Sequence, residues 1–194
     1  RRRFLVEAVL LGVVGSLPMS GEANALAFIE STGTDASRWL MVAAGTAGVG
    51  IVDVSSPATP RAVSNLRLAG SAVDVAVDAA LRVAAVAGQQ GGLHLIDVSQ
   101  PLAPRLVRTV ALNATSVEVF EGIAYVVTGS EIRSYDLLTG ERLDGVSLPS
   151  PIRSLARDGN ALYVTDTRDS LRLFTVESGL LTPRGSLRLP ADTV

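Results

Sequence analysis

Residues 48–61 read GVGIVDVSSPATPR, and residues 91–105 repeat the pattern as GGLHLIDVSQPLAPR. The two aspartates, Asp53 and Asp97, set a period of roughly 44 residues, which is typical of stacked supersecondary units. Strand-rich units of this length predict the blades of a β-propeller. This stretch therefore decides the fold class, which we expect to be all-β with four-stranded antiparallel blades.

The second repeat supplies the template for one blade. Residues 73–77 alternate apolar and polar or small side chains, and residues 81–87 form an apolar run that ends at Gly88. The first pattern is typical of a half-buried strand, and the second of a strand buried on both faces. Two further strands follow, at residues 92–98 and 106–112. The same template predicts four blades, at residues 24–68, 73–112, 116–148 and 152–189.

The recurring residues have structural explanations. A carboxylate such as Asp53 or Asp97, at the end of a strand, accepts a backbone N–H from the turn that follows. Pro57 fixes φ within that turn, whereas Pro60 lies just before the outermost strand, whose free edge a proline protects from unwanted pairing.

The two ends of the chain follow the same register. Residues 12–17 align with the outer strand of a preceding blade, Gly21 aligns with Gly70, and residues 189–194 align with 68–73. We therefore expect residues 1–194 to form a partial β-propeller domain, an open ring with about four blades and one extra strand. An alternative is a leader peptide, which the basic and apolar start of the chain resembles, followed by a closed ring of four blades.

Composition excludes several classes of protein. The chain has no cysteine, so disulfides and thiolate metal sites are absent. Its net charge is −2 and it carries no block of basic residues beyond the three arginines at positions 1–3, which argues against a nucleic-acid partner. No uninterrupted apolar run is long enough for a membrane span. Arginine supplies all the basic residues, which we interpret as the codon bias of a GC-rich bacterial genome.

The two clear repeats resemble the LVIVD repeat family. The matching residues are GIVDVSSP at 50–57 and LHLIDVSQP at 93–101, and the likeness extends over roughly residues 40–130. Beyond that, Asp136 survives without the Ser-x-Pro loop, and Thr175 replaces the aspartate of the fourth blade. The resemblance implies a β-propeller in a secreted, periplasmic or surface-associated bacterial protein, and it carries no general catalytic motif.

Few residues suggest chemistry, and we expect no catalytic, cofactor or metal site. His94 is the only histidine, so we interpret it as structural. The segment 45–50 is rich in glycine but leads into a strand, which excludes a phosphate loop at a helix N-terminus. The sole tryptophan, Trp39, falls in a buried strand and is assigned to the core. The polar turn 166–169 has the carboxylate spacing of a calcium ligand pair, but Arg168 favours a solvated turn.

Propeller ligands usually meet the loops that gather at one mouth of the central channel. The residues that we expect there are Gln89, Gln90, Glu131, Asp166 and Asp169. We expect the chain to be a non-enzymatic interaction or display scaffold whose partner is a protein or a surface glycan, besides neighbouring blades of a larger chain. The alternative is part of a ligand-binding or enzymatic propeller whose active residues lie outside this segment.

Overall fold

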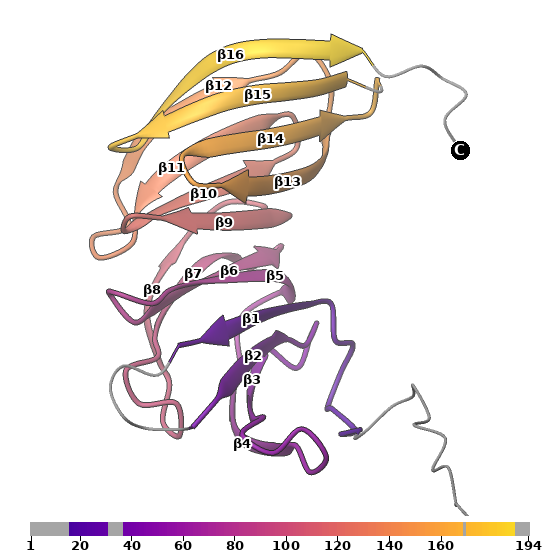
Figure 1. Ribbon diagram of the computed structural model, residues 1–194, viewed down its shortest axis with the longest axis vertical. Coiled ribbons are helices and arrows are strands. Elements are labelled where there is room, and N and C mark those ends of the chain that lie inside the picture. Colours follow the sequence, from indigo (N-terminus) through magenta and orange to yellow (C-terminus); the bar gives the residue numbers. More distant parts are fainter. Residues whose placement is uncertain (1–15, 31–36, 169, 189–194) are drawn as a thin grey trace, which may run out of the picture.

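The computed structural model describes residues 16–30, 37–168 and 170–188, which form sixteen β-strands in four sheets (Figure 1). Each sheet contains four consecutive antiparallel strands in sequence order, so the all-β prediction of four-stranded blades is confirmed. The strands of blade 1 are β1 (Ala25–Ile29), β2 (Trp39–Ala43), β3 (Val49–Asp53) and β4 (Arg61–Leu66). Those of blade 2 are β5 (Ser71–Asp78), β6 (Val83–Gln89), β7 (Gly92–Asp97) and β8 (Arg105–Val110).

The second half of the chain continues this order. Blade 3 consists of β9 (Ser116–Phe120), β10 (Ile123–Thr128), β11 (Glu131–Asp136) and β12 (Arg142–Ser147). Blade 4 consists of β13 (Ile152–Asp158), β14 (Ala161–Asp166), β15 (Ser170–Glu177) and β16 (Leu180–Arg188). The sequence template predicts strands at residues 116–120 and 123–128, and β9 and β10 have these bounds.

For the outer strand of blade 4 the sequence template predicts residues 185–189, whereas β16 begins at Leu180. Ser178 and Gly179 both have positive φ values, 49° and 87°, as the two central residues of a tight hairpin do. Pro183 lies inside this strand, and the register shifts beside it, between Leu173 and Phe174 of β15. An edge strand tolerates a proline at such a bulge, so Pro183 marks an irregularity within the strand.

Each hydrophobic core cluster lies between two consecutive blades. In β6, Ala84 and Val86 belong to the cluster shared with blade 1, whereas Ala85 and Ala87 belong to the cluster shared with blade 3. A third cluster joins β10 to blade 4 and includes the fully buried Tyr125. Successive side chains of a strand point to opposite faces, so the apolar run of β6 serves two neighbours at once.

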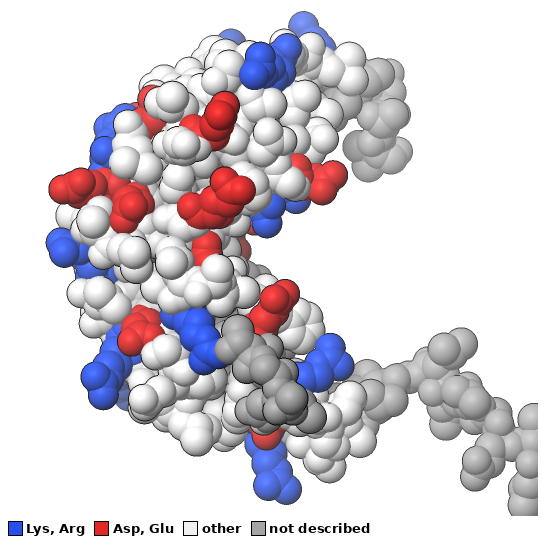
Figure 2. All heavy atoms as spheres, turned by 60° about the vertical axis from the view of Figure 1, so that its left-hand side comes forward, with Lys and Arg blue, Asp and Glu red and all other residues white. Residues whose placement is uncertain are grey.

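The four blades fan into an arc that stays open on one side, as Figures 1 and 2 both show. The innermost strands β1, β5, β9 and β13 follow one another along the concave side, each packed against the next. The alternative of a closed four-blade ring is therefore wrong, and the prediction of an open ring is confirmed.

The segment before β1 repeats the geometry of a blade-to-blade connection. Gly21 and Gly70 both have positive φ, 98° and 73°, and a Cβ on either would collide with a carbonyl oxygen. The Met19 side chain lies over Gly50, on the face of blade 1 that points away from blade 2. Of the outer strand expected at residues 12–17, residues 12–15 lie outside the described part, and the last two residues belong to no strand.

Candidate binding surface at the loop end of the blades

The blade-to-blade connections and the turns between second and third strands lie at one end of the blades, which we call the loop end. Antiparallel order places them together, because both follow strands that run in the same direction. Each of these turns is bonded to the connection that follows it. The N–H of Gly45 donates to the Ala72 carbonyl at 3.0 Å, the N–H of Gln90 to Asn113 Oδ1 at 3.1 Å, and the N–H of Ile152 to the Gly129 carbonyl at 2.9 Å. This framework fixes the surface on which a partner would dock.

Gln89 and Gln90 are exposed at the loop end, where the sequence places them. Gln90 has a positive φ of 58°, and its turn continues into Gly91, where a Cβ would collide with the Ala69 carbonyl. The close approach of the blade 1–2 connection thus requires the glycine. Both glutamines are exposed, which leaves their amide groups available for a polar contact.

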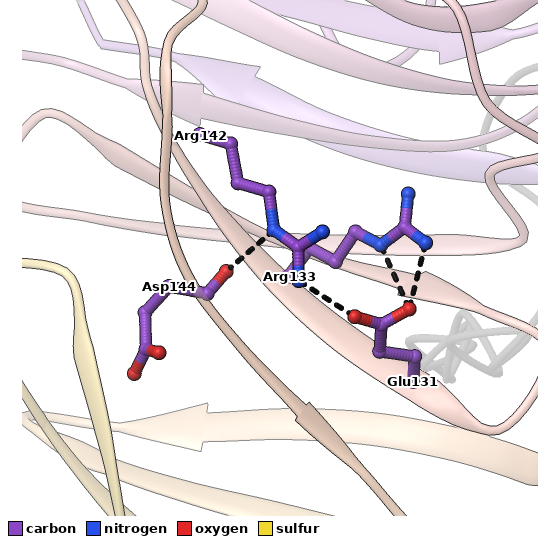
Figure 3. Close-up of polar contacts among 4 residues, drawn as sticks. All are labelled: Glu131, Arg133, Arg142 and Asp144. Atoms are coloured by element: carbon purple, nitrogen blue, oxygen red, sulfur yellow. Dashed lines mark hydrogen bonds and ion pairs between the residues drawn. The ribbon is translucent and has the colours of Figure 1, made fainter.

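Glu131, the third of these residues, lies between two arginines (Figure 3). Its Oε2 accepts from Arg133 Nε and Nη2 at 2.9 and 2.7 Å, and its Oε1 accepts from Arg142 Nη2 at 2.7 Å. Hydrogen bonds and charge from Arg133 hold the pKa of Glu131 below its usual range, with a smaller effect of Arg142. The carboxylate joins β11 to β12, so its charge is already balanced within blade 3.

Asp166 is at the loop end, but its side chain is fully buried at the end of β14. Its Oδ1 accepts from the N–H groups of Arg168 at 2.9 Å and Ser170 at 3.2 Å, and its Oδ2 faces Arg172 Nε at 3.4 Å. Burial alone would raise the pKa of Asp166, but the hydrogen bonds outweigh it and lower the pKa. Asp166 organises its own turn, and Asp169 lies outside the described residues.

His94 is buried and bonded on both ring nitrogens, which agrees with a structural role. Its Nε2 donates to the Ala69 carbonyl at 3.0 Å, since a carbonyl can only accept, and its Nδ1 accepts from the Thr109 hydroxyl at 3.0 Å. Desolvation lowers the pKa of His94, and the bond to Ala69 opposes that shift. Trp39, assigned to the core, is only partly buried and packs against the cluster between blades 1 and 2.

The repeated aspartates form the strand-end bonds that the sequence predicts. Oδ1 of Asp53 accepts the N–H of Ser55 at 2.9 Å, and that of Asp97 accepts the N–H of Ser99 at 2.8 Å. The serine side chains and then these backbone bonds lower the pKa of both carboxyls. In blade 3, Asp136 binds its different turn in the same way.

One group of residues at the loop end escaped the sequence analysis. Arginine side chains meet around a groove of about 430 Å³ on blade 4, lined by Pro149, Arg168, Ser170, Arg172 and Arg188. The signal was an arginine, serine, arginine alternation at 168, 170 and 172. The sequence alone does not show that Arg188 lies beside these residues, because their proximity depends on the register that pairs Ser170 with Arg188 across β15 and β16.

Comparison with known proteins agrees with this architecture. The LVIVD repeat model matches residues 38–67 and 69–112. Residues 38–112 carry LVIVD repeats. The chain is also similar to the crystal structure of the Cps50 (Swd1) β-propeller domain of Myceliophteria thermophila, with a TM-score of 0.65 at 15% identity. That match covers 83% of this chain and 57% of the other, and it establishes the propeller fold beyond the LVIVD repeats. A search of curated proteins finds no match.

No three histidine or carboxylate side chains among the described residues are arranged to hold a metal ion. The same residues contain no helix of the length and apolarity that crossing a bilayer requires.

Proposed function

We propose that the chain is a non-enzymatic β-propeller scaffold that presents its loop end to a partner. The observation that carries this proposal is the use of polar side chains between blades. Asp74 Oδ2 of blade 2 accepts from the Ser116 hydroxyl at 2.7 Å and from the Val117 N–H at 2.9 Å, both in blade 3. Asp78 Oδ2 accepts the Gly122 N–H at 2.8 Å, also in blade 3.

The same arrangement recurs between blades 3 and 4. Asp144 Oδ2 accepts the N–H of Leu181 at 2.9 Å, and the Ser134 hydroxyl donates to the Gly179 carbonyl. Buried polar groups that are bonded in this way fix one relative position of two packed elements. These side chains therefore hold blade against blade, as a scaffold requires, and they leave the exposed side chains of the loop end for contact with a partner.

The cellular setting is part of the proposal. A chain with seventeen arginines and no lysine or cysteine suits a bacterial protein made from a GC-rich genome. The LVIVD repeats favour an envelope or extracellular location, where the partner is a protein or a surface glycan. We propose that location for this chain.

The chain itself provides the test, because a single introduced cysteine is a unique attachment point. Gln90→Cys places a photo-crosslinker at the loop end, and Leu102→Cys places it at the opposite end, where Leu102 is 66% exposed. Each labelled protein is added to intact cells of the source organism and illuminated. We expect a discrete adduct from position 90 only. Equal adducts from both positions, or none from position 90, would contradict a docking surface at the loop end.

A further inference from the structure

The arginine groove of blade 4 is built on a buried carboxylate. Asp166, whose side chain has no exposed area, bonds the backbone of the turn that carries Arg168 and also contacts Arg172. The carboxylate therefore holds the guanidinium of Arg172 directly, and it fixes the backbone from which the Arg168 side chain extends. Pre-positioned charged groups lose less conformational entropy when they bind a ligand.

Among the described residues of the groove, three arginines accompany the single carboxylate of Asp166. Arg168 and Arg188 are exposed, and no ion pair connects either of them to a described carboxylate. Ser170 lies between them, paired with Arg188 in the antiparallel register. A guanidinium binds sulfate, phosphate or carboxylate groups through parallel hydrogen bonds, so the groove has the chemistry of an oxyanion site.

A second depression continues the groove along the edge of the sheet. It has a volume of about 230 Å³, shares Arg172 with the first, and adds Arg184, Ser186 and Gly185. A Cβ at Gly185 would meet no atom within 4 Å, so the strip is open at this point. Arg184 and Arg188 lie four residues apart on β16, which corresponds to roughly 13 Å along a strand. We call these two joined depressions the arginine strip.

We propose that the arginine strip binds a linear acidic polysaccharide, one that carries sulfate or uronate groups along its length. This inference rests on the proposed function, since it names the partner that a part of the loop end would take. Charges spaced along an open strip suit repeated oxyanions on one chain better than a single small ion. Aromatic stacking, whose scarcity argues against a neutral-sugar site, is not needed for electrostatic recognition.

The lining of the strip separates this partner from other polyanions. Single-stranded nucleic acids are usually held by stacking on aromatic side chains, and the one aromatic residue here, Phe174, is only 2% exposed. An acidic peptide would need sockets for its apolar side chains, whereas the strip presents arginine, serine, glycine and proline. Hydroxyl and guanidinium donors remain, and these suit the oxygen-rich surface of an acidic sugar chain.

The test uses the purified chain and polymers of defined composition. Binding is measured by isothermal titration calorimetry with heparin, polygalacturonate, neutral dextran, sodium sulfate, a single-stranded oligonucleotide and poly-glutamate, at about 50 and about 200 mM NaCl. We expect saturable binding to heparin or polygalacturonate that weakens with salt. Arg168→Gln or Arg188→Gln should each weaken binding about tenfold, and the double variant should abolish it.

Arg153→Gln is the matched control, because Arg153 is exposed on the same blade but lies outside the strip. It has the same charge change and should bind as the unmodified chain does, and thermal melts verify that every variant is folded. If Arg153→Gln weakened binding as much as the strip variants do, the effect would come from net charge alone, which would overturn the proposal. Tighter binding to the oligonucleotide or poly-glutamate, or binding of sulfate without any gain from the polymers, would overturn it too. If the chain forms a partner adduct at position 90 but does not bind acidic polysaccharides, this inference is wrong and the proposed function still stands.

Discussion

Blade 2 and blade 4 share a topology but differ in how many faces they bury. Every residue of β6 in blade 2 is buried except its last, Gln89. In the equivalent strand of blade 4, β14, burial alternates: Leu162 and Val164 are buried, whereas Tyr163 is 38% exposed. The difference shows that blade 2, which lies between two others, has buried side chains at consecutive positions of this strand, whereas blade 4, which packs against blade 3 alone, has them at alternate positions.

The size of the side chains differs in the same way. Strand β6 uses alanine and valine, which let neighbouring sheets approach from both sides. On blade 4 the face away from blade 3 carries Tyr163, Leu171, Leu173 and Thr175, which are paired across β14 and β15 or lie next to that pair. Half-exposed leucine and tyrosine on this face cover the sheet without a second blade upon it. The two faces of one blade therefore contribute unequally to stability.

The largest effect is expected from a charge placed in β6, the strand of blade 2 that is buried on both faces. Ala85→Asp places an unpaired carboxylate at a site with no exposed area, at a cost of several kcal/mol, which is comparable with the whole stability of a domain, about 5–15 kcal/mol. We expect the variant to lose its cooperative thermal melt and to aggregate in size-exclusion chromatography.

The matched control is Ala156→Asp, on the exposed face of blade 4. It introduces the same charge and should melt within a few degrees of the unmodified chain. Equal behaviour of the two variants would show that β6 is not enclosed on both faces.

A smaller effect compares the two faces of blade 4. Leu162 is fully buried against blade 3, so Leu162→Ala should lower the free energy of unfolding by about 3 kcal/mol. Leu173→Ala removes the same atoms from the opposite, half-buried face and should cost less than about 1 kcal/mol. Urea unfolding followed by circular dichroism measures both values. A similar loss from both would mean that a further layer of protein covers the second face.

The strands could be predicted because alternation and punctuation are local. The apolar run at 81–87 located β6 correctly, although the observed strand begins at Val83 rather than at Leu81 and continues through Gly88 to Gln89. The start of β16 was missed because Pro183, just before the predicted start at Gly185, resembles a loop residue, and only the pairing with β15 places residues 180–184 in the strand. A proline therefore gave the wrong strand boundary here, because a β-bulge accommodates it inside the strand.

The candidate surface was harder to predict, because it depends on burial and register. Asp166 lies in a polar stretch that is typical of a solvated turn. In the structure its carboxylate is buried instead and accepts hydrogen bonds from its own turn and from Arg172. Arg188 lies beside Ser170 only through the pairing of two strands. A sequence shows which charges exist, whereas the register determines which of them meet.

The smallest effect concerns His94, which occupies the position that Gly50 holds in blade 1. Desolvation lowers the pKa of His94 in the folded chain, so the unfolded chain binds the proton more readily. The contribution of neutral His94 to the free energy of unfolding is fully present above its pKa in the unfolded chain, about 6.5. It is lost as the pH falls through that value toward the lower pKa of the folded chain. We expect the free energy of unfolding to decrease between about pH 7 and about pH 5.5.

Because His94 is the only histidine, His94→Gln should remove this part of the slope. Glu118, whose pKa is raised by desolvation, titrates in both proteins and cancels in their difference. Urea unfolding at several pH values gives the two slopes. Parallel slopes would mean that the imidazole of His94 is solvated. The environment of position 94, next to the Ala69 carbonyl, would then differ less from that of position 50, which Met19 covers, than the structure indicates.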